Sequence, residues 1–353
     1  MSLPLNRCVM PTIRYLVLGL TTRCNLSCAY CYHAGLERGM DMSPEVARTA
    51  LDLVALGEGP LHVQLSGGEP TLAREMVRYV VAEIRRLKRP CTVGIQTNAT
   101  LLDEDLVRFL GEHGVQVGVS LDGPPAIQQR LRGEADKALL GLTLLEKMGV
   151  PFRVTTVVGS ENCGQLSRLG LMLAGFRCAR GIGLDLLVAR GGGCSGGMEL
   201  PDPRILEQEV GSLVRLLAAV NGRRSVPLRL RELDLVGKAL SGKRGKGWFC
   251  HACLGESLAV HPDGRLYPCG QTLGDDRFEA GSLSHPRLSR LRWNDPRPLG
   301  SPDCPGCPLE GSCPGECPSR LYYNRSSRPD LACAVYRGCL AALEGEGRQA
   351  VSL

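Results

Sequence analysis

Residues 21–32 read TTRCNLSCAYCY, and Cys24, Cys28 and Cys31 give this stretch the spacing CxxxCxxC. Three cysteines are an odd number for disulfides and one too few for a tetrahedral metal site. Three thiolates in one loop can instead hold three irons of a cubane 4Fe-4S cluster, which leaves the fourth iron without a protein ligand. The alternative is a structural zinc knuckle, in which His33 would supply the fourth ligand.

On both sides of this loop, short apolar runs alternate with segments of helical periodicity. Strands are expected at 13–20, 61–65, 91–98, 115–121, 152–158 and 181–187. One helix is expected to begin at Ser43, with Pro44 in its first turn, and another to be capped by Asp103. Six strands alternating with helices predict an α/β fold, a partial (β/α)6 TIM-like barrel whose chemistry collects at the carboxyl ends of its strands.

The composition excludes several classes of protein. The 353 residues include 42 basic and 36 acidic side chains without a basic arm, so nucleic acid is not an expected partner. The apolar run YLVLGL is too short to span a membrane, and a cytoplasmic location is expected. Of the 17 cysteines, three lie at 24–31 and nine between 250 and 339. This clustering favours metal or iron–sulfur ligation over a secreted disulfide scaffold.

The N-terminal loop resembles the signature of the radical SAM superfamily, in which an aromatic residue, here Tyr30, precedes the last cysteine. The resemblance implies that the amino and carboxylate groups of S-adenosylmethionine (SAM) chelate the open iron. An electron from the cluster would then break the S–C5′ bond, releasing methionine and a 5′-deoxyadenosyl radical that abstracts hydrogen from a substrate.

Two further groups of barrel residues support the resemblance. LSGGEP at 65–70 resembles the GGE motif, in which Gly67 and Gly68 let the main chain approach SAM and Glu69 receives the methionine ammonium group. Taken alone, this stretch would be read as a glycine turn. The segments QTNAT and SLDGP resemble those that contact the ribose and carboxylate of SAM, which implies cofactor-binding roles for Gln96, Asn98 and Ser120.

Asp122, within SLDGP, is the one candidate for a catalytic residue, and the substrate base is otherwise not assignable. Its alternative reading is a turn carboxylate that bonds to its own backbone. Many radical SAM relatives continue after this segment with a His-Asp pair and an arginine, whereas this chain reads PAIQQRLRG, with Arg130 and Arg132. Substrate contacts that depend on the His-Asp pair are therefore not expected here.

The C-terminal cysteines follow a second pattern, CxxCxxxxxCxxxC at 304–317, with Cys269 before it and Cys333 after it. The pattern resembles the SPASM extension of radical SAM enzymes, which implies two auxiliary 4Fe-4S clusters. By that resemblance the first cluster would be held by Cys250, Cys253, Cys269 and Cys317, and the second by Cys304, Cys307, Cys313 and Cys333. Cys250 follows the pattern least well, and without it the first cluster would have an open iron for a substrate thiol. Two structural zinc ribbons are the alternative.

These patterns predict three parts of the chain: a radical SAM barrel at 1–190, bridging helices at 191–246 and a SPASM domain at 247–345. Residues 189–203, ARGGGCSGGMELPDP, are expected to form a flexible boundary. Two helices are expected after it, at about 204–219 and 230–240.

The resemblance implies a maturase that modifies a ribosomally synthesised peptide or protein by a crosslink, a thioether or an oxidation. A flavodoxin- or ferredoxin-type protein would be its reductant. No separate leader-binding domain is expected before the first strand. The alternative enzyme is an anaerobic sulfatase-maturing enzyme, which forms formylglycine. A zinc-stabilised binding module or an iron–sulfur electron carrier is the alternative of another class.

Overall fold

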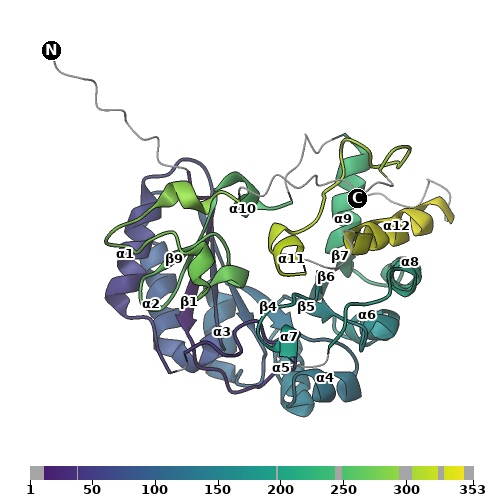
Figure 1. The fold of residues 1–353 in the computed structure, drawn as a ribbon. Coiled ribbons are helices and arrows are strands. Elements are labelled where there is room, and N and C mark those ends of the chain that lie inside the picture. Colours follow the sequence, from purple (N-terminus) through teal and green to yellow (C-terminus); the bar gives the residue numbers. More distant parts are fainter. Residues whose placement is uncertain are drawn as a thin grey trace.

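A single nine-stranded sheet organises the residues described by the structure, a computed structural model (Figure 1). The described residues are 12–37, 39–195, 198–242, 249–293, 304–324 and 330–345. The strands follow the order β7-β6-β5-β4-β3-β2-β1-β8-β9, and all neighbours are parallel except β8 and β9. The expected α/β class and partial barrel are confirmed.

All six predicted strands are present in the sheet. They are β1 (Tyr15–Thr21), β2 (Leu61–Gly67), β3 (Cys91–Thr97), β4 (Gln116–Ser120), β5 (Phe152–Val158) and β6 (Ala179–Leu186). A further short strand, β7 (Arg229–Leu230), pairs with β6. Because each connection between the six strands contains a helix, their carboxyl ends meet at one edge of the sheet, which is where the chemistry is expected.

Helices connect these strands, and two of them begin where the sequence predicts. They are α1 (Pro44–Ala55), α2 (Arg74–Ile84), α3 (Glu104–Glu112), α4 (Pro125–Leu131), α5 (Ala135–Lys147) and α6 (Leu166–Ala174). The Ser43 hydroxyl accepts a hydrogen bond from Val46 N at 3.2 Å, and the Asp103 carboxylate accepts one from Leu106 N at 2.9 Å. Both side chains cap their helices as expected.

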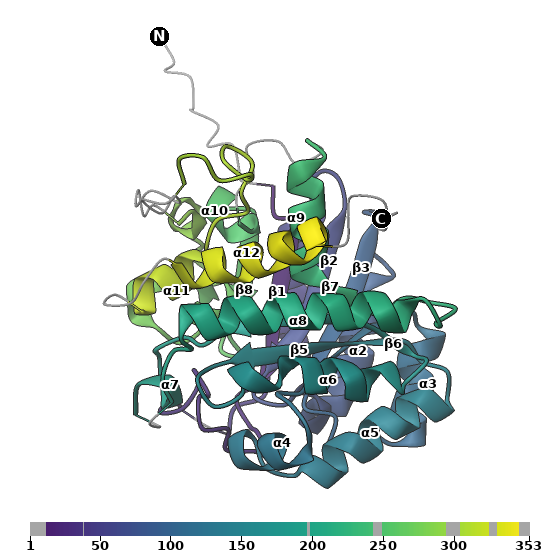
Figure 2. The ribbon, with the colours of Figure 1, turned by 90° about the vertical axis from the view of Figure 1, so that its right-hand side faces the viewer.

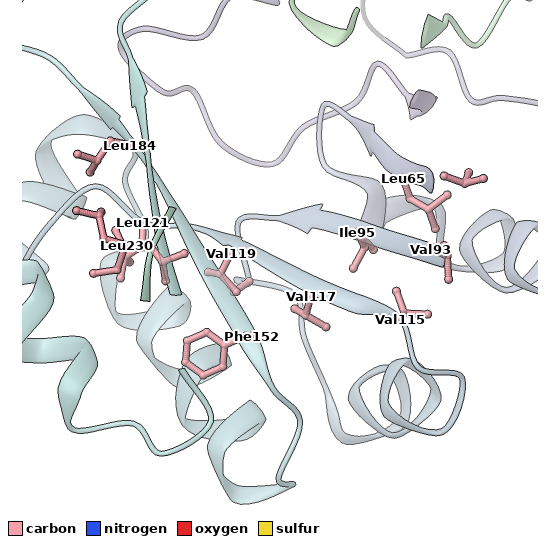
Figure 3. Packing of buried hydrophobic residues seen from close by; sticks show 14 of the residues in the cluster. Leu65, Val93, Ile95, Val115, Val117, Val119, Leu121, Phe152, Leu184 and Leu230 are labelled. Carbon is pink, nitrogen blue, oxygen red and sulfur yellow. The ribbon is translucent and has the colours of Figure 1, made fainter. Parts of the chain in front are cut away.

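The barrel core lies between the sheet and these helices. Figure 3 shows Leu65, Ile95, Val119 and Phe152, which come from four neighbouring strands and are all buried. The same core continues into the C-terminal part of the chain, where Val260 and Leu331 belong to it. The two parts are therefore packed as one body, and the predicted division at residues 190 and 246 stays a prediction.

The C-terminal part also extends the sheet. It contains α7 (Gly192–Ser195), α8 (Pro203–Asn221), α9 (Arg231–Leu240), α10 (His251–Leu254), β8 (Ser257–Val260), β9 (Leu266–Tyr267), α11 (Pro318–Tyr323) and α12 (Asp330–Gly345). Among the described residues, five short 3-10 helices lie at Pro70–Ala73, Cys163–Gln165, Gly270–Thr272, Asp276–Phe278 and Leu288–Leu291. The predicted helices at 204–219 and 230–240 are confirmed as α8 and α9, and α12 runs alongside α8 (Figure 2). β8 pairs with β1, which the sequence did not predict.

The glycine-rich stretch after β6 is not a free linker over residues 189–195. Gly192 N donates a hydrogen bond to Cys31 O at 2.9 Å. Gly191 has a φ of +55°, and a Cβ added there would lie 2.7 Å from the same carbonyl oxygen. The glycines allow this stretch to pack directly on the N-terminal cysteine loop, so the expected flexibility is wrong here. In the described part of the chain, no helix is both long and apolar enough to cross a membrane.

Candidate functional site

A cavity of about 520 Å³ lies between the carboxyl ends of the barrel strands and the C-terminal part. Cys24, Cys28 and Cys31 line it from the loop after β1, and three thiols of the C-terminal part face it from the other side: Cys250, Cys269 and Cys317. Small-molecule and cofactor sites in proteins have volumes of about 300–1,000 Å³. The cavity therefore has the size of a cofactor site, with thiols on two of its walls.

Gly67 and Gly68 allow the backbone of the cysteine loop to contact the end of β2 closely. Gly68 N donates to Thr21 O at 2.8 Å, and a Cβ added at Gly68 would lie 2.2 Å from Arg23 O. Gly67, with a φ of +132°, would bring a Cβ to 2.4 Å from Thr21 O. The predicted reason for these glycines was approach to SAM. The structure gives a further one, because only glycine permits this contact between the two backbones.

Glu69 is a buried carboxylate with a fixed orientation. Its Oε1 accepts hydrogen bonds from the Thr97 hydroxyl at 2.7 Å and from the Thr71 hydroxyl at 2.6 Å, and its Oε2 accepts one from Asn98 N at 2.7 Å. Burial raises its pKa, although these hydrogen bonds oppose the shift. The carboxylate lines the cavity, so a cationic group there would relieve its desolvation.

The other cofactor-binding candidates also line the cavity, where they bond to one another or to the cysteine loop. Gln96 Nε2 donates to the Ser120 hydroxyl at 2.9 Å. Asn98 Nδ2 donates to Asn25 Oδ1 at 2.9 Å, which ties the end of β3 to the loop between Cys24 and Cys28. Tyr30 lines the cavity as well. The residues implied by the resemblance are thus brought together at one site.

Asp122 is placed differently. Its side chain is fully buried in an ion pair with Arg132, in which Nε and Oδ2 are 2.8 Å apart, and it accepts a hydrogen bond from the Tyr30 hydroxyl. Asp122 is not among the described residues that line the cavity. This placement counts against a catalytic role. The alternative prediction, a turn carboxylate that bonds to its own backbone, is incomplete too, because the carboxylate bonds to other elements.

The three N-terminal thiols are close enough to influence one another electrostatically. Burial raises the pKa of Cys28 to about 11, and burial also raises the pKa of Cys24. Both thiols would therefore be protonated at neutral pH unless a cation were bound. A bound iron would supply the charge that makes them thiolates, so the loop fits a metal cluster by its donor set.

His33, the alternative zinc ligand, is turned toward Gly67 and Gly270. Burial lowers its pKa to about 4, and its Nε2 is buried without a hydrogen-bond partner in the described residues. Within the described part of the chain, no three His, Cys, Asp or Glu side chains lie at the spacing that would hold one metal ion.

The thiols predicted for the first auxiliary cluster form one group. Cys250 is influenced electrostatically by Cys253, Cys269 and Cys317. The Sγ atoms of Cys250 and Cys253 are 4.0 Å apart, and this contact raises the pKa of Cys250 and lowers that of Cys253 to about 6. The structure thus brings the four residues together, and whether Cys250 binds iron stays a prediction.

The thiols predicted for the second auxiliary cluster form another group. Burial raises the pKa of Cys333, on α12, to about 11, and its electrostatic neighbours are Cys313, Cys304 and Cys307. None of these four is among the described residues that line the cavity. The grouping matches the predicted ligand set, and it lies away from the space where a substrate could bind.

Four charged residues of the cavity wall were not predicted: Arg132, Asp185, Arg231 and Arg320. Asp185, near the end of β6, lies 3.5 Å from Arg320 and 3.7 Å from Arg231. The rule that chemistry collects at strand ends could have identified Asp185. Arg231 and Arg320 are distant from Asp185 in sequence and had no such signal, because only the fold brings them to β6.

Comparisons with known proteins agree with this arrangement. Residues 18–164 match the model of the radical SAM superfamily. The serine-type anaerobic sulfatase-maturating enzyme of Klebsiella aerogenes is 25% identical over 337 residues, which cover 89% of this chain and 81% of that enzyme.

Two solved structures share the fold. Native anSMEcpe with bound AdoMet and Cp18Cys peptide has a TM-score of 0.75 at 20% identity, covering 95% of this chain and 98% of that one. Streptococcus suis SuiB bound to the precursor peptide SuiA has a TM-score of 0.60 at 17% identity, covering 90% of this chain and 74% of that one.

Proposed function

Because this chain is an enzyme of the radical SAM superfamily, we propose that it is a maturase that crosslinks, oxidises or forms a thioether in a ribosomally made peptide or protein. Its family implies a 4Fe-4S cluster and SAM as cofactors. One observation carries the proposal: the N-terminal thiols and three C-terminal thiols line the same cavity. A substrate side chain in that cavity would lie between the two sets of thiols.

In this proposal Cys24, Cys28 and Cys31 hold the SAM-binding cluster. The residues that would bind SAM are Tyr30, Gly67, Gly68, Glu69, Gln96, Asn98 and Ser120. When bound, the cluster and SAM supply the radical that removes a hydrogen atom from the substrate. The work of the protein is to hold the loop rigidly, to present a carboxylate to the methionine ammonium group, and to keep the site enclosed.

Two auxiliary 4Fe-4S clusters belong to the proposal as well. Cys250, Cys253, Cys269 and Cys317 would hold the first at the cavity, and Cys304, Cys307, Cys313 and Cys333 would hold the second behind it. Electrons removed from the substrate need an acceptor, and a cluster held at the cavity wall would be able to take them. A flavodoxin- or ferredoxin-type protein is the proposed reductant.

The similarity to a serine-type sulfatase-maturating enzyme over most of both chains favours a second candidate, formylglycine formation in a sulfatase. The two candidates differ in substrate and share the cofactors. In the second case the target Ser of a sulfatase peptide would lose two hydrogen atoms to become formylglycine. A target Cys would lose two hydrogen atoms to give a thioaldehyde, which water would convert to formylglycine with release of hydrogen sulfide. Mass spectrometry of that peptide after turnover separates the two candidates.

The first experiment is metal and sulfide analysis of the anaerobically purified protein, followed by SAM cleavage after dithionite reduction. Three cubanes would give about twelve irons per chain with matching sulfide. The proposal expects iron near that number and 5′-deoxyadenosine among the products. Zinc without iron would support the binding module, and iron without SAM cleavage would support the electron carrier; either result would contradict the proposal.

A further inference from the structure

We infer that Arg132 is a positioning residue that raises the reduction potential of the N-terminal cluster and is held against Cys28 by Asp122. The inference rests on the proposed function, since it requires a cluster on Cys28. Arg132 Nη1 lies 3.9 Å from Cys28 Sγ, at the cavity wall. Arg132 directly follows the last residue of α4, and it is far from the cysteine loop in sequence.

The guanidinium group of Arg132 has one available orientation. Its Nε lies 2.8 Å from Asp122 Oδ2 and its Nη2 lies 3.4 Å from Oδ1, so two nitrogens face two oxygens of the same carboxylate. The guanidinium carbon lies 5.2 Å from the centre of the Tyr30 ring. The side chains of Arg132 and Asp122 are 11% and 0% exposed. A planar group fixed on three sides cannot turn toward solvent.

Asp122 is itself fixed by other elements. Its Oδ1 accepts a hydrogen bond from Val157 N on β5 at 2.9 Å, and Tyr30 of the cysteine loop donates to its Oδ2. Gln128 Oε1 accepts from Asp122 N at 3.0 Å. The ion pair therefore connects β5, α4 and the cysteine loop. Gln128 belongs to the stretch PAIQQRLRG, and here it supports Asp122.

The charge arrangement gives the sign of the effect. Reducing a cluster adds negative charge to its thiolates, and a nearby cation stabilises the reduced form. Arg132 Nη1 lies 3.9 Å from Cys28 Sγ, whereas the Asp122 carboxylate contacts Nε and Nη2 of the same guanidinium group, so the ion pair presents its positive member to the sulfur. Hydrogen bonds and charges around cluster sulfurs are known to tune reduction potential. Arg132 should make the cluster easier to reduce.

The chain offers a matched control. Arg130 lies two residues earlier, in the last turn of α4, where it pairs with Glu161 at 2.6 Å and is 56% exposed. R132M removes the buried cation, and R130M removes the exposed one. R132M also leaves Asp122 buried without its partner, so a double variant, R132M/D122N, removes both charges and avoids that defect.

The experiment is an EPR-monitored redox titration of the full-length, reconstituted proteins, in which the N-terminal cluster is recognised by the response of its signal to SAM in wild type. We expect the midpoint potential to be most negative in R132M, less negative in the double variant, and unchanged in R130M. Equal potentials in all four proteins would overturn the inference. Loss of iron from both Arg132 variants, with R130M fully loaded, would make the pair a structural support and also overturn it. A wild type without a SAM-responsive signal would instead refute the proposed function.

Discussion

The two sets of thiols are supported in different ways. Cys24, Cys28 and Cys31 lie in one short loop that contacts the ends of β2 and β3, the glycine stretch after β6, and Arg132. Among the C-terminal thiols of the two predicted ligand sets, Cys333 lies in the first turn of α12, and the others lie in turns or within or directly before short helices. The barrel therefore prepares the first site before iron arrives, whereas we expect the second region to depend on its clusters for its shape.

Replacement of single cysteines should have the largest effect, and the effect should differ between the two sets of thiols. C28A is expected to abolish SAM cleavage, because the SAM-binding cluster would lose one of only three protein ligands. C307A should retain SAM cleavage and lose substrate modification, since Cys307 lies away from the cavity. Production of 5′-deoxyadenosine and of modified peptide measures the two effects. C194A, at an exposed cysteine, is the control. Full SAM cleavage by C28A would contradict the assignment.

Removal of iron tests the difference in support directly. We expect the amides of residues 304–317 to lose hydrogen-exchange protection when iron is chelated, while the amides of β1 to β6 keep theirs. The physical reason is that many residues of the strands belong to the buried core, whereas Leu309 is the one core member among residues 304–317, with Cys307 and Cys313 packed against the core. Hydrogen exchange of loaded and iron-free protein, compared peptide by peptide, gives the answer. Equal loss of protection in both regions would remove the distinction.

Gly68→Ala should disturb the N-terminal site by displacing the backbone of the cysteine loop. The added Cβ would lie 2.2 Å from Arg23 O, so the cysteine loop must move. We expect loss of the N-terminal cluster and a free energy of unfolding lower by about 1–3 kcal/mol. Iron analysis and denaturant unfolding measure the two effects. Gly164→Ala is the control, because its Cβ would meet no atom within 4 Å. A fully loaded G68A protein would show that the contact is unimportant.

Ser43→Ala should give the smallest effect, confined to the barrel. Loss of the cap on α1 is expected to reduce the free energy of unfolding by about 1 kcal/mol. The reduction should be the same with and without iron if the barrel stands independently of its clusters. Thr143→Ala, at an exposed mid-helix hydroxyl that donates to Leu139 O, should change stability by less than about 0.5 kcal/mol. If S43A lost different amounts of unfolding free energy in loaded and iron-free protein, the stability of the barrel would depend on the clusters.

The barrel was largely predictable because its signals are local. Alternating apolar runs identified β1 to β6, and Ser43 and Asp103 identified two helix starts. β8 was missed since its four residues give too short a pattern, and its pairing with β1 joins Tyr15 to Ser257, which are far apart in the sequence.

The candidate site, too, was predictable only where its signals are local in sequence. The ligand sets implied by the resemblance match the groups of thiols that the structure brings together, and their binding of clusters stays a prediction. The cysteine pattern gave no sign of Arg132, whose proposed role depends on a buried partner that the fold supplies. The glycines at 191 and 192 were misread as a linker for a similar reason. Glycine is equally suited to a flexible segment and to close backbone contact, and only the structure distinguishes the two.

The central claim is that the N-terminal loop leaves one iron of its cluster open for SAM. The most direct measurement is the EPR spectrum of the anaerobically reduced protein, recorded with and without SAM. We predict that SAM changes the signal of one cluster and that this signal is absent from C28A. A fully iron-loaded wild type whose spectrum is identical with and without SAM would contradict the account.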